Sequence, residues 1–458
     1  MGMAREATNA QINFYRWSEI SHADRERIMR RSHADMPDVE KLVAPIVDDV
    51  KSRGDQALVD YALKFDGATI GLDQIKATEE DFALAESRLD ADLKKAIAHS
   101  ARNVEKFHAE QMRRVEDRWM FEVEPGVWAG EQVTAIPSVG LYVPRGKGAF
   151  PSSVIMIGMP ARIAGVEEIH IVTPPKPDGS FDDATLYAAQ LCGVKNVYKA
   201  GGAQGIAALA YGTETIPAVK KVLGPGSPYV QAAKKICGHV MNPGMPAGAS
   251  DSLVLVDETA HIGNTILDLL NEVEHGSDSS GLLVTHSEEI ARAVVEGLPE
   301  AIDSLPEPHR QICFDVMSSY GAVVLTDSLE QSIEVANEYA PEHLLLKVKD
   351  PASIIDKIQH AGEILIGEYT PSTFGNFVIG VNHVLPVGQQ AHTYSCTTIW
   401  DYLKRTSLSL VDRQGFDALE ESAFKFAEYE DFPAHGRAVS ARELDEAVLV
   451  QPPSVDKL

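Results

Sequence analysis

The sequence predicts an α/β protein with parallel sheets. Between residues 141 and 256, short apolar strands alternate with amphipathic helices, as in "VEEIHIVTPP" followed by "ATLYAAQLCGV". A second alternating stretch runs from 281 to about 370 and contains the strands "GLLVTHS", "GAVVLT" and "HLLLKV". Alternation at this spacing is typical of βαβ units, whose crossovers place successive strands parallel in one sheet.

The flanking segments have different patterns. Residues 1 to about 115 carry apolar side chains at three-to-four spacing, with Gly54 and Gly67 ending two predicted helices. Residues 117–143 contain short runs between Gly and Pro, which predict strands. Residues 371–400 are rich in Gly, Ser, Thr and Asn and predict irregular structure, whereas the last 50 residues are predicted to be helical.

The composition argues against several classes of function. Among 458 residues, 41 Lys and Arg stand against 67 Asp and Glu, and the net charge of -26 disfavours binding to nucleic acid or to an anionic membrane. Four dispersed cysteines without a CxxC motif indicate neither a thiolate zinc site nor a disulfide framework, and fit a reducing cytoplasm. No secretory signal and no membrane-length apolar run is found. We therefore expect a cytoplasmic protein that binds neither nucleic acid nor a membrane.

Three predicted strand ends open into glycine-rich turns, "PRGKGAFPSS", "AGGAQGIAAL" and "LGPGSPYV". Glycines at such places allow a pyrophosphate to approach the backbone at a helix N-terminus. None of the three is a GxGxxG motif, so each one alone is better explained as a tight turn in an α/β sheet. Together they favour a phosphate-binding face. Arg145 and Lys147 would add positive charge to that face, or else are two solvated loop cations.

Glu272 and His275 lie three positions apart at the end of a predicted amphipathic helix, "HIGNTILDLLNEVEHG". At this spacing both side chains lie beside the apolar stripe and could bind one metal, or could form a surface pair. Glu167 and His170 have the same spacing but lie in a predicted strand, where they point to opposite faces. No second helical Glu-x-x-His exists for a di-iron site.

Three further clusters carry residues suited to catalysis. In "YAPEHLLL", Glu342 and His343 stand side by side just before an apolar run, either as a base with its companion or as a strand-entry turn. Asn376, Asn382 and His383 fall in the predicted irregular segment. A break between two helical runs holds two more polar residues, Glu430 and His435.

Taken together, these motifs resemble the histidinol dehydrogenase family. "GLYVPRGKGAFPSSVIM", "GGAQGIAALAYGTE", "GPGSPYV", "EHG", "YAPEHL", "NHVLP" and "PAH" follow one another in the family's order over about residues 35–445. The resemblance implies a homodimer of two incomplete Rossmann-like domains with parallel sheets, whose C-terminal segment reaches into the partner's active site. It also implies zinc, and two NAD molecules that convert a primary alcohol to a carboxylic acid through a retained aldehyde.

Residue roles and domains follow from the same resemblance. His343 is expected to take the hydroxyl proton and Glu342 to activate water. The implied zinc ligands are Glu272, His275, Asn376 and His435, the last from the partner subunit. The implied substrate contacts are Ser152, Ser250, His383 and Glu430, and the implied NAD contacts are Tyr142, Gln204 and Ser227. The expected division is an N-terminal helical arm (1–30), a first α/β domain (31–140 with 251–385), an NAD-binding domain (141–250) and a C-terminal helical dimerisation segment (386–458).

The zinc positions depart from the family pattern of Gln, His, Asp and His. Here Glu272 replaces the Gln and Asn376 replaces the Asp, so a carboxylate and an amide have exchanged places without changing the formal charge. Oxygen and nitrogen ligands of this kind suit zinc, which we therefore expect to be retained. In the third glycine turn, Ser227 stands where the family has Asn.

These departures favour a paralogue such as the sulfopropanediol 3-dehydrogenases. The preferred substrate is then 2,3-dihydroxypropane-1-sulfonate, oxidised to sulfolactate, with Arg145 or Lys147 binding the sulfonate. The retained Glu430 favours the alternative, L-histidinol oxidised to L-histidine. A different class, a non-catalytic two-lobed solute-binding protein, would leave Glu342 and His343 without a purpose, and a purely structural α/β dimer would leave the histidine clusters unexplained.

Overall fold

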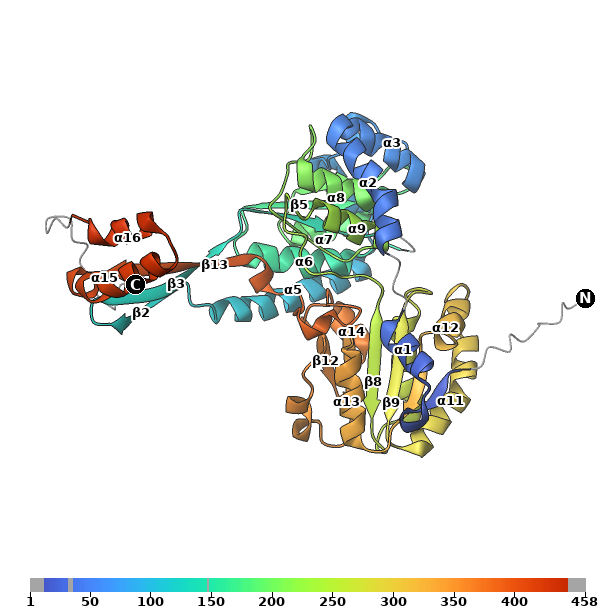
Figure 1. Cartoon of the computed structure of the whole chain (residues 1–458). Coiled ribbons are helices and arrows are strands. Elements are labelled where there is room, and N and C mark those ends of the chain that lie inside the picture. Colours follow the sequence, from blue (N-terminus) through green and yellow to red (C-terminus); the bar gives the residue numbers. More distant parts are fainter. Residues whose placement is uncertain (1–11, 32–35, 146–147, 444–458) are drawn as a thin grey trace, which may run out of the picture. The chain divides into compact units, whose positions relative to one another are not determined.

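The structure, a computed structural model, describes residues 12–31, 36–145 and 148–443. Its contacts divide these residues into two units (Figure 1). The first unit comprises the described residues up to 109 together with 137–399, and the second comprises 110–136 and 400–443. The first unit contains two parallel sheets covered by helices, and the second contains an antiparallel sheet and two helices.

The larger sheet of the first unit has six parallel strands in the order β1-β10-β9-β8-β11-β12. Its central strands are almost continuous apolar runs because both faces of the sheet are buried. Helices α10, α11 and α12 cover one face, and α1 and α13 cover the other. The strands are β1 (Phe14–Arg16), β8 (Asp251–Val256), β9 (Ser280–Thr285), β10 (Ala322–Leu325), β11 (His343–Lys347) and β12 (Glu363–Ile366), and the helices are α1 (His22–Arg30), α10 (Ile262–Val273), α11 (Glu288–Asp303), α12 (His309–Met317), α13 (Leu329–Tyr339) and α14 (Ser372–Phe377).

The smaller sheet has four parallel strands in the order β6-β5-β4-β7. Helices α2, α3, α8 and α9 share one apolar core with residues of this sheet, and α6 packs against β4 and β5. The strands are β4 (Ser138–Tyr142), β5 (Glu168–Thr173), β6 (Asn196–Lys199) and β7 (Lys221–Leu223), and the helices are α2 (Met36–Arg53), α3 (Asp55–Asp66), α4 (Glu79–Arg88), α5 (Ala91–Arg113), α6 (Pro151–Ile163), α7 (Asp183–Leu191), α8 (Gly202–Tyr211) and α9 (Pro228–Cys237).

Two of the expected domain assignments differ from the observed packing. Residues 12–30 of the expected N-terminal arm are not a separate helical arm, because β1 pairs with β10 and Ile28 of α1 lies in the core of the six-stranded sheet. Residues 1–11 lie outside the described residues. Helices α2 and α3 were expected with residues 251–385, yet Val43 and Leu58 share a core with Tyr198 of the four-stranded sheet. Helical periodicity identifies an apolar face but does not say which sheet covers it.

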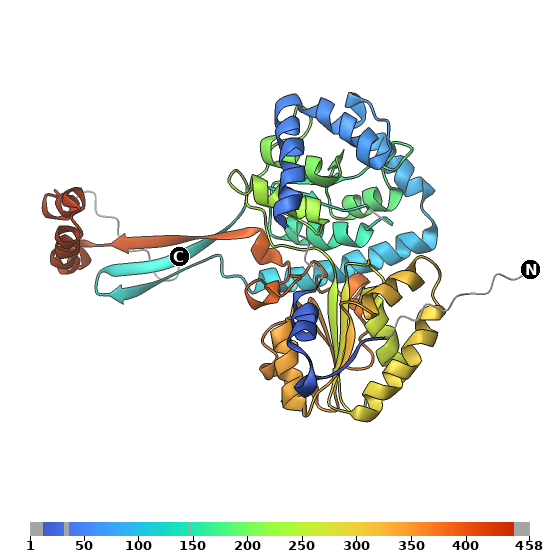
Figure 2. The same ribbon diagram turned by 45° about the vertical axis from the view of Figure 1, so that its right-hand side comes forward.

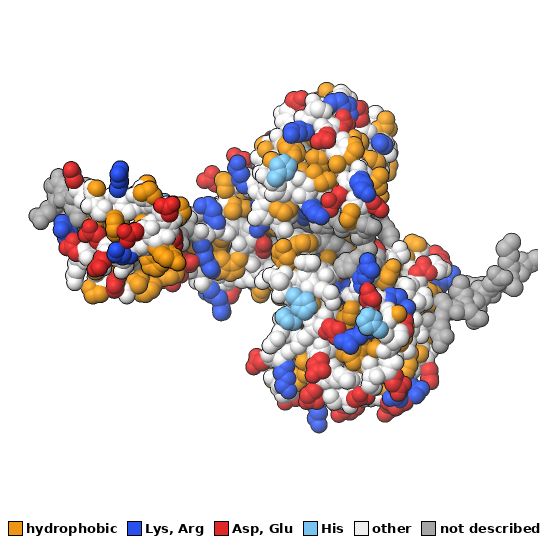
Figure 3. Space-filling view, in the orientation of Figure 1, with side chains coloured by type: hydrophobic (Ala, Val, Ile, Leu, Met, Phe, Trp, Pro, Cys, Tyr) orange, Lys and Arg blue, Asp and Glu red, His pale blue; other side chains and the backbone are white. Residues whose placement is uncertain are grey.

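The second unit is built on β2 (Arg118–Glu124), β3 (Val127–Ala135) and β13 (Leu403–Val411), which form an antiparallel sheet in the order β13-β3-β2 (Figure 2). Helices α15 (Arg413–Tyr429) and α16 (Pro433–Ser440) follow, as expected for the C-terminal region. The expectation that 386–458 is helical is wrong for β13, whose pairing partner β3 lies far away in the sequence. Apolar side chains are exposed in this unit (Figure 3), among them Phe121, Val123 and Phe426.

None of the helices in the described ranges combines the length and apolar character that a bilayer crossing needs.

Candidate active site

Three neighbouring strands of the six-stranded sheet begin with a charged residue. Asp251 opens β8, His343 opens β11 and Glu363 opens β12. The register pairs His343 with Ser252 on one side and with Glu363 on the other. Because the strands are parallel, their amino-terminal ends lie together along one side of the sheet, called here its amino edge. The apolar remainder of β8 and of β11 is packed between helices, which fixes the position of the first residue of each strand.

His343 lies at the centre of this edge. Its Nδ1 is 2.6 Å from Glu363 Oε1, and its Nε2 is 3.7 Å from Glu342 Oε2 and 3.8 Å from Glu272 Oε2. A carboxylate at Nδ1 sets the ring orientation and leaves Nε2 toward the other two groups. Burial disfavours the charged ring, but the carboxylates of Glu272, Glu342 and Glu363 outweigh it and raise the pKa of His343 to about 10.

The carboxyl group of Glu342 is buried, and its pKa is raised. Burial raises the pKa of Glu342 well above its ordinary value; the charge of His343 opposes this rise, whereas Asp251 and Glu272 add to it. Its backbone N–H donates to Asp251 Oδ1 at 2.7 Å, and its Oε2 accepts from the Asp251 N–H at 3.2 Å. A carboxyl group with a raised pKa beside an imidazole is suited to general acid–base chemistry near neutral pH.

A second group of side chains meets at the end of α10. The helix begins at the side-chain cap of His261, and its apolar stripe is buried as the periodicity predicts, so that Glu272 faces inward in the last turn. Glu272 Oε1 accepts from the amide nitrogen of Asn376 at 2.7 Å, and Glu272 Oε2 is 3.4 Å from Nδ1 of His275. Asn376 lies on the short helix α14 rather than in the expected irregular loop.

The donor set at this point fits a zinc ion. No group of three or more His, Cys, Asp and Glu side chains in the described ranges has the arrangement of a metal site, but one of the three expected ligands here is an amide. Glu272 Oε2 is buried, and no described residue shares a hydrogen bond with it. A cation would satisfy that oxygen, and carboxylate, imidazole and amide oxygen are donors that zinc accepts. In the structure Asn376 turns its amide nitrogen toward Glu272, whereas its oxygen is the atom that a metal would take.

Two of the expected substrate residues adjoin these ligands. Ser250 Oγ lies 2.9 Å from Nδ1 of His275. His383 Nδ1 is 2.5 Å from the backbone oxygen of Asn376, and burial lowers the pKa of His383 to about 4, so its ring is neutral. Its Nε2 lies 3.4 Å from Ser153 Oγ, and the expected contact Ser152 is the neighbouring residue in the first turn of α6.

The expected NAD contacts gather at the carboxyl edge of the four-stranded sheet. Tyr142 ends β4, Gln204 lies in the first turn of α8 after β6, and Ser227 is the N-cap residue of α9 after β7. Tyr142 Oη accepts from the N–H of Gly202 at 3.1 Å. The chain places β5 and β6 on one side of β4 and β7 on the other, and dinucleotides bind at such a switch point.

Two backbone segments lie so close together at this end of the sheet that one position must be glycine. Gly224 has a φ of +116°, and a Cβ there would lie 2.1 Å from the backbone oxygen of Tyr142. Only glycine allows the third glycine turn to lie directly against the end of β4. Arg145, in the first turn, donates to the backbone oxygen of Pro175 at 3.4 Å. Lys147 lies outside the described residues.

The two remaining candidates lie in the second unit. Glu430 follows α15 and His435 lies on α16, so they flank the break between two helices that the sequence predicts. The ring of His435 lies 5.1 Å from that of Phe432. The roles of Glu430 and His435 therefore stay predictions.

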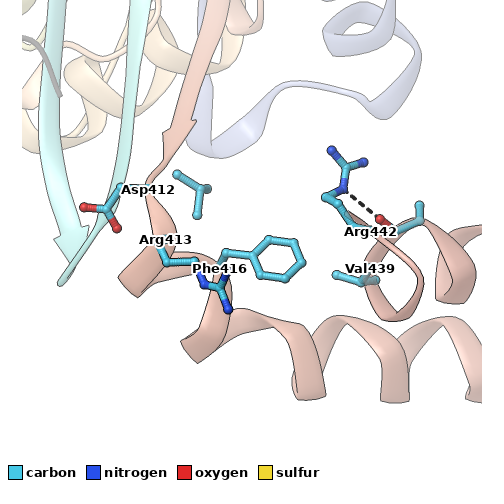
Figure 4. Close-up of a pocket in the computed structure, with 7 residues that line it drawn as sticks. Asp412, Arg413, Phe416, Val439 and Arg442 are labelled. Carbon is cyan, nitrogen blue, oxygen red and sulfur yellow. Dashed lines mark hydrogen bonds between the residues drawn. The ribbon is translucent and has the colours of Figure 1, made fainter. Parts of the chain in front are cut away.

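A cavity of about 410 Å³ in the second unit holds none of the expected site residues (Figure 4). Its polar groups are engaged at helix ends: Asp412 accepts from the Gly415 N–H at 3.0 Å, and Arg442 Nε donates to the Ala438 oxygen at 2.9 Å. The lining residues are Val411, Asp412, Arg413, Phe416, Ala438, Val439 and Arg442.

Glu363 and Asp251 were not identified as site residues from the sequence. Each is an acidic residue at the start of an otherwise apolar strand, "GEILIG" and "DSLVLV". One signal could have identified them. Each places a charged residue at the first position of a buried strand, and both strands pair with β11, the strand that His343 begins.

Comparisons with known proteins agree on one family. The family model described as histidinol dehydrogenase matches residues 29–443. A histidinol dehydrogenase of Synechocystis sp. is 44% identical over 93% of this chain and 98% of its own length, and a histidinol dehydrogenase homolog of Colwellia psychrerythraea is 43% identical over 96% and 98%. The crystal structure of histidinol dehydrogenase from Elizabethkingia anophelis superimposes with a TM-score of 0.88, at 33% identity over 94% of this chain and 97% of that one.

Proposed function

Because the chain belongs to the histidinol dehydrogenase family, we propose that it is a zinc- and NAD-dependent dehydrogenase that oxidises a primary alcohol to a carboxylate in two hydride-transfer steps. The observation that carries this proposal is the buried cluster in which His343 Nε2 faces both Glu342 and Glu272 while Glu363 holds Nδ1. A second acid–base group, Glu342, and a candidate metal ligand, Glu272, thus lie within 4 Å of the imidazole nitrogen that serves as the base.

In the first step the neutral form of His343 takes the hydroxyl proton at Nε2 as hydride passes from the carbinol carbon to NAD. The alcohol becomes an aldehyde and one NADH forms. The carboxylate of Glu363 at Nδ1 stabilises the imidazolium that results. Zinc held by Glu272 and His275 would supply a Lewis acid for the substrate oxygen and would offset the negative charge of Glu272.

In the second step Glu342 removes a proton from water as the water oxygen attacks the aldehyde carbon. The resulting hydrate anion then loses hydride to a second NAD and its remaining hydroxyl proton to the protein, which gives the carboxylate and a second NADH. The raised pKa of Glu342 makes its carboxylate a stronger base than an ordinary glutamate, which suits this task.

The same proposal assigns the remaining residues. Glu272, His275 and Asn376, with His435 of the partner subunit, would hold the zinc. The buried Glu272 Oε2, which shares no hydrogen bond with a described residue, supports this. The protein would then act as a homodimer with shared sites in the cytoplasm. Ser152, Ser250, His383 and Glu430 would contact substrate, and Tyr142, Gln204 and Ser227 would contact NAD.

Two alcohols are candidate substrates. The exchange of carboxylate and amide between Glu272 and Asn376 favours 2,3-dihydroxypropane-1-sulfonate, because it redistributes charge around the substrate relative to the family's usual ligand set. The excess of carboxylates around His343 favours L-histidinol, whose amine is cationic, and relatives named histidinol dehydrogenase support that alternative. Arg145 contacts Pro175, and no described cation other than histidine contacts Glu272 or Glu342.

The test is NADH formation by the purified protein with each alcohol in parallel. Oxidation of either alcohol with two NADH per molecule supports the reaction class, and the ratio of kcat/KM identifies the substrate. A His343→Ala variant serves as the control for contaminating dehydrogenases. Tight binding of an alcohol without NADH formation would instead support a solute-binding protein.

A further inference from the structure

We infer that Arg31 and Asp251 are positioning residues for Glu342, and that their buried ion pair holds the Glu342 carboxyl group where it can act on water. This inference rests on the proposed role of Glu342. Neither residue belongs to the expected zinc, substrate or NAD contacts. Both lie in the six-stranded-sheet part of the first unit, Asp251 at the start of β8 and Arg31 directly after α1.

Asp251 and Glu342 form a reciprocal clamp. The Glu342 N–H donates to Asp251 Oδ1 at 2.7 Å, and the Asp251 N–H donates to Glu342 Oε2 at 3.2 Å. One bond therefore fixes the backbone of Glu342 and the other fixes its carboxyl group. With both partners nearly inaccessible to water, the clamp operates in a medium where hydrogen bonds are strong.

Arg31 holds the other side of the clamp. Its Nη1 lies 3.0 Å from Asp251 Oδ2 as an ion pair, and the same oxygen accepts from the Gly388 N–H at 2.9 Å. A second guanidinium nitrogen donates to the backbone oxygen of Tyr339, and the guanidinium lies 3.7 Å from the centre of the Tyr339 ring. Arg31 thus joins Asp251 to the residue that begins the turn into Glu342.

The turn itself needs such support. Ala340 has a φ of +47°, a left-handed conformation that a residue with a side chain adopts only when its surroundings impose it. Pro341 follows and cannot donate a backbone hydrogen bond. Contacts on both sides of this pair, at Tyr339 and at Glu342, therefore determine where the Glu342 side chain points.

A purely structural role for the ion pair is the competing explanation. A buried ion pair can often be replaced by apolar side chains without loss of stability, so burial of Arg31 and Asp251 does not by itself stabilise the fold. The chain offers a matched control in the same sheet. Lys347 and Asp268 form a buried ion pair at the opposite end of β11, with no contact to Glu342.

The kinetic experiment compares Asp251→Asn with Asp268→Asn in the full-length holoenzyme. We expect Asp251→Asn to lower kcat for the aldehyde by roughly 10- to 100-fold, the usual effect of losing hydrogen bonds to a charged group. The alcohol step and the KM for NAD should change far less, and in a Glu342→Gln background the same substitution should have almost no further effect. Asp268→Asn should leave the ratio of the two steps unchanged. Equal losses in both steps, or a full effect in the Glu342→Gln background, would overturn the inference.

A second readout needs no substrate. Hydrogen–deuterium exchange at the Glu342 amide should accelerate in Asp251→Ala and in the double variant Arg31→Met with Asp251→Asn, but not in Asp268→Asn. Unchanged protection of that amide would overturn the clamp even if those variants were inactive. If Glu342→Gln leaves both oxidation steps intact, the proposed function fails, whereas the exchange experiment still decides whether the clamp exists.

Discussion

Lys234 offers a prediction in which stability depends on pH through one buried group. It lies on α9, the helix that follows the third glycine turn, and is 2% exposed. Its Nζ donates to the backbone oxygen of Gly224, in that turn, at 2.7 Å. Burial lowers the pKa of Lys234 from 10.5 to about 7. Between these two values the unfolded chain holds a proton that the folded chain has released, so folding stability rises with pH across that window.

The size of the effect follows from the same two values. Each pKa unit corresponds to about 1.4 kcal/mol, so burial of Lys234 costs about 5 kcal/mol below pH 7, and the cost disappears as pH approaches 10.5. Relative to Lys234→Met, the wild-type free energy of unfolding should therefore rise by about 2 kcal/mol between pH 7.5 and 9.5.

Urea unfolding at equal protein concentration measures this difference. Lys235→Met is the matched control, because Lys235 is an exposed neighbour whose Nζ pairs with Glu40 at 2.6 Å. Its stability should follow the pH dependence of the wild type. Parallel pH dependence for the wild type and Lys234→Met would refute the assignment of a neutral buried lysine at this position.

Three further predictions concern the reaction. His343→Ala should lower kcat by roughly three orders of magnitude, as expected for loss of a general base, while metal analysis finds zinc unchanged; loss of zinc would make His343 a ligand instead. Glu342→Gln should slow oxidation of the added aldehyde more than that of the alcohol, and equal damage would remove its role as water activator. Mixing inactive His343→Ala and His435→Ala chains should restore about half the wild-type activity per heterodimer. In a two-fold dimer with shared sites, one of the two sites then contains both an intact His343 and an intact His435. A confirmed but inactive heterodimer would place His435 in the site of its own chain.

The parallel α/β architecture was predictable, but the grouping of its helices was not. Strand–helix alternation depends on local periodicity, and both sheets are parallel as it predicts. Helices α2 and α3 were assigned to the wrong sheet because their partners α8 and α9 lie more than 100 residues away. Strand β13 was missed for a similar reason. It contains Lys, Arg, Thr and Ser, and it is defined mainly by its pairing with β3.

Parts of the site were predictable to different degrees. The proximity of Glu272 and His275 was predicted from helical spacing, and the structure has them 3.4 Å apart, although α10 ends at Val273 and His275 lies in the turn that follows. The approach of Asn376 and His343 to Glu272 was expected only from the resemblance, because no local pattern joins residues so distant in sequence. Glu363 was missed because its role depends on the parallel register that sets it beside His343.

X-ray data collected at the zinc absorption edge from crystals of the full-length protein would locate the metal. We predict one anomalous peak per chain, in contact with Glu272, His275 and Asn376 and within reach of the substrate oxygen that faces His343. A zinc-replete protein with its peak at any other place, or with no peak among these side chains, would contradict the proposed active site.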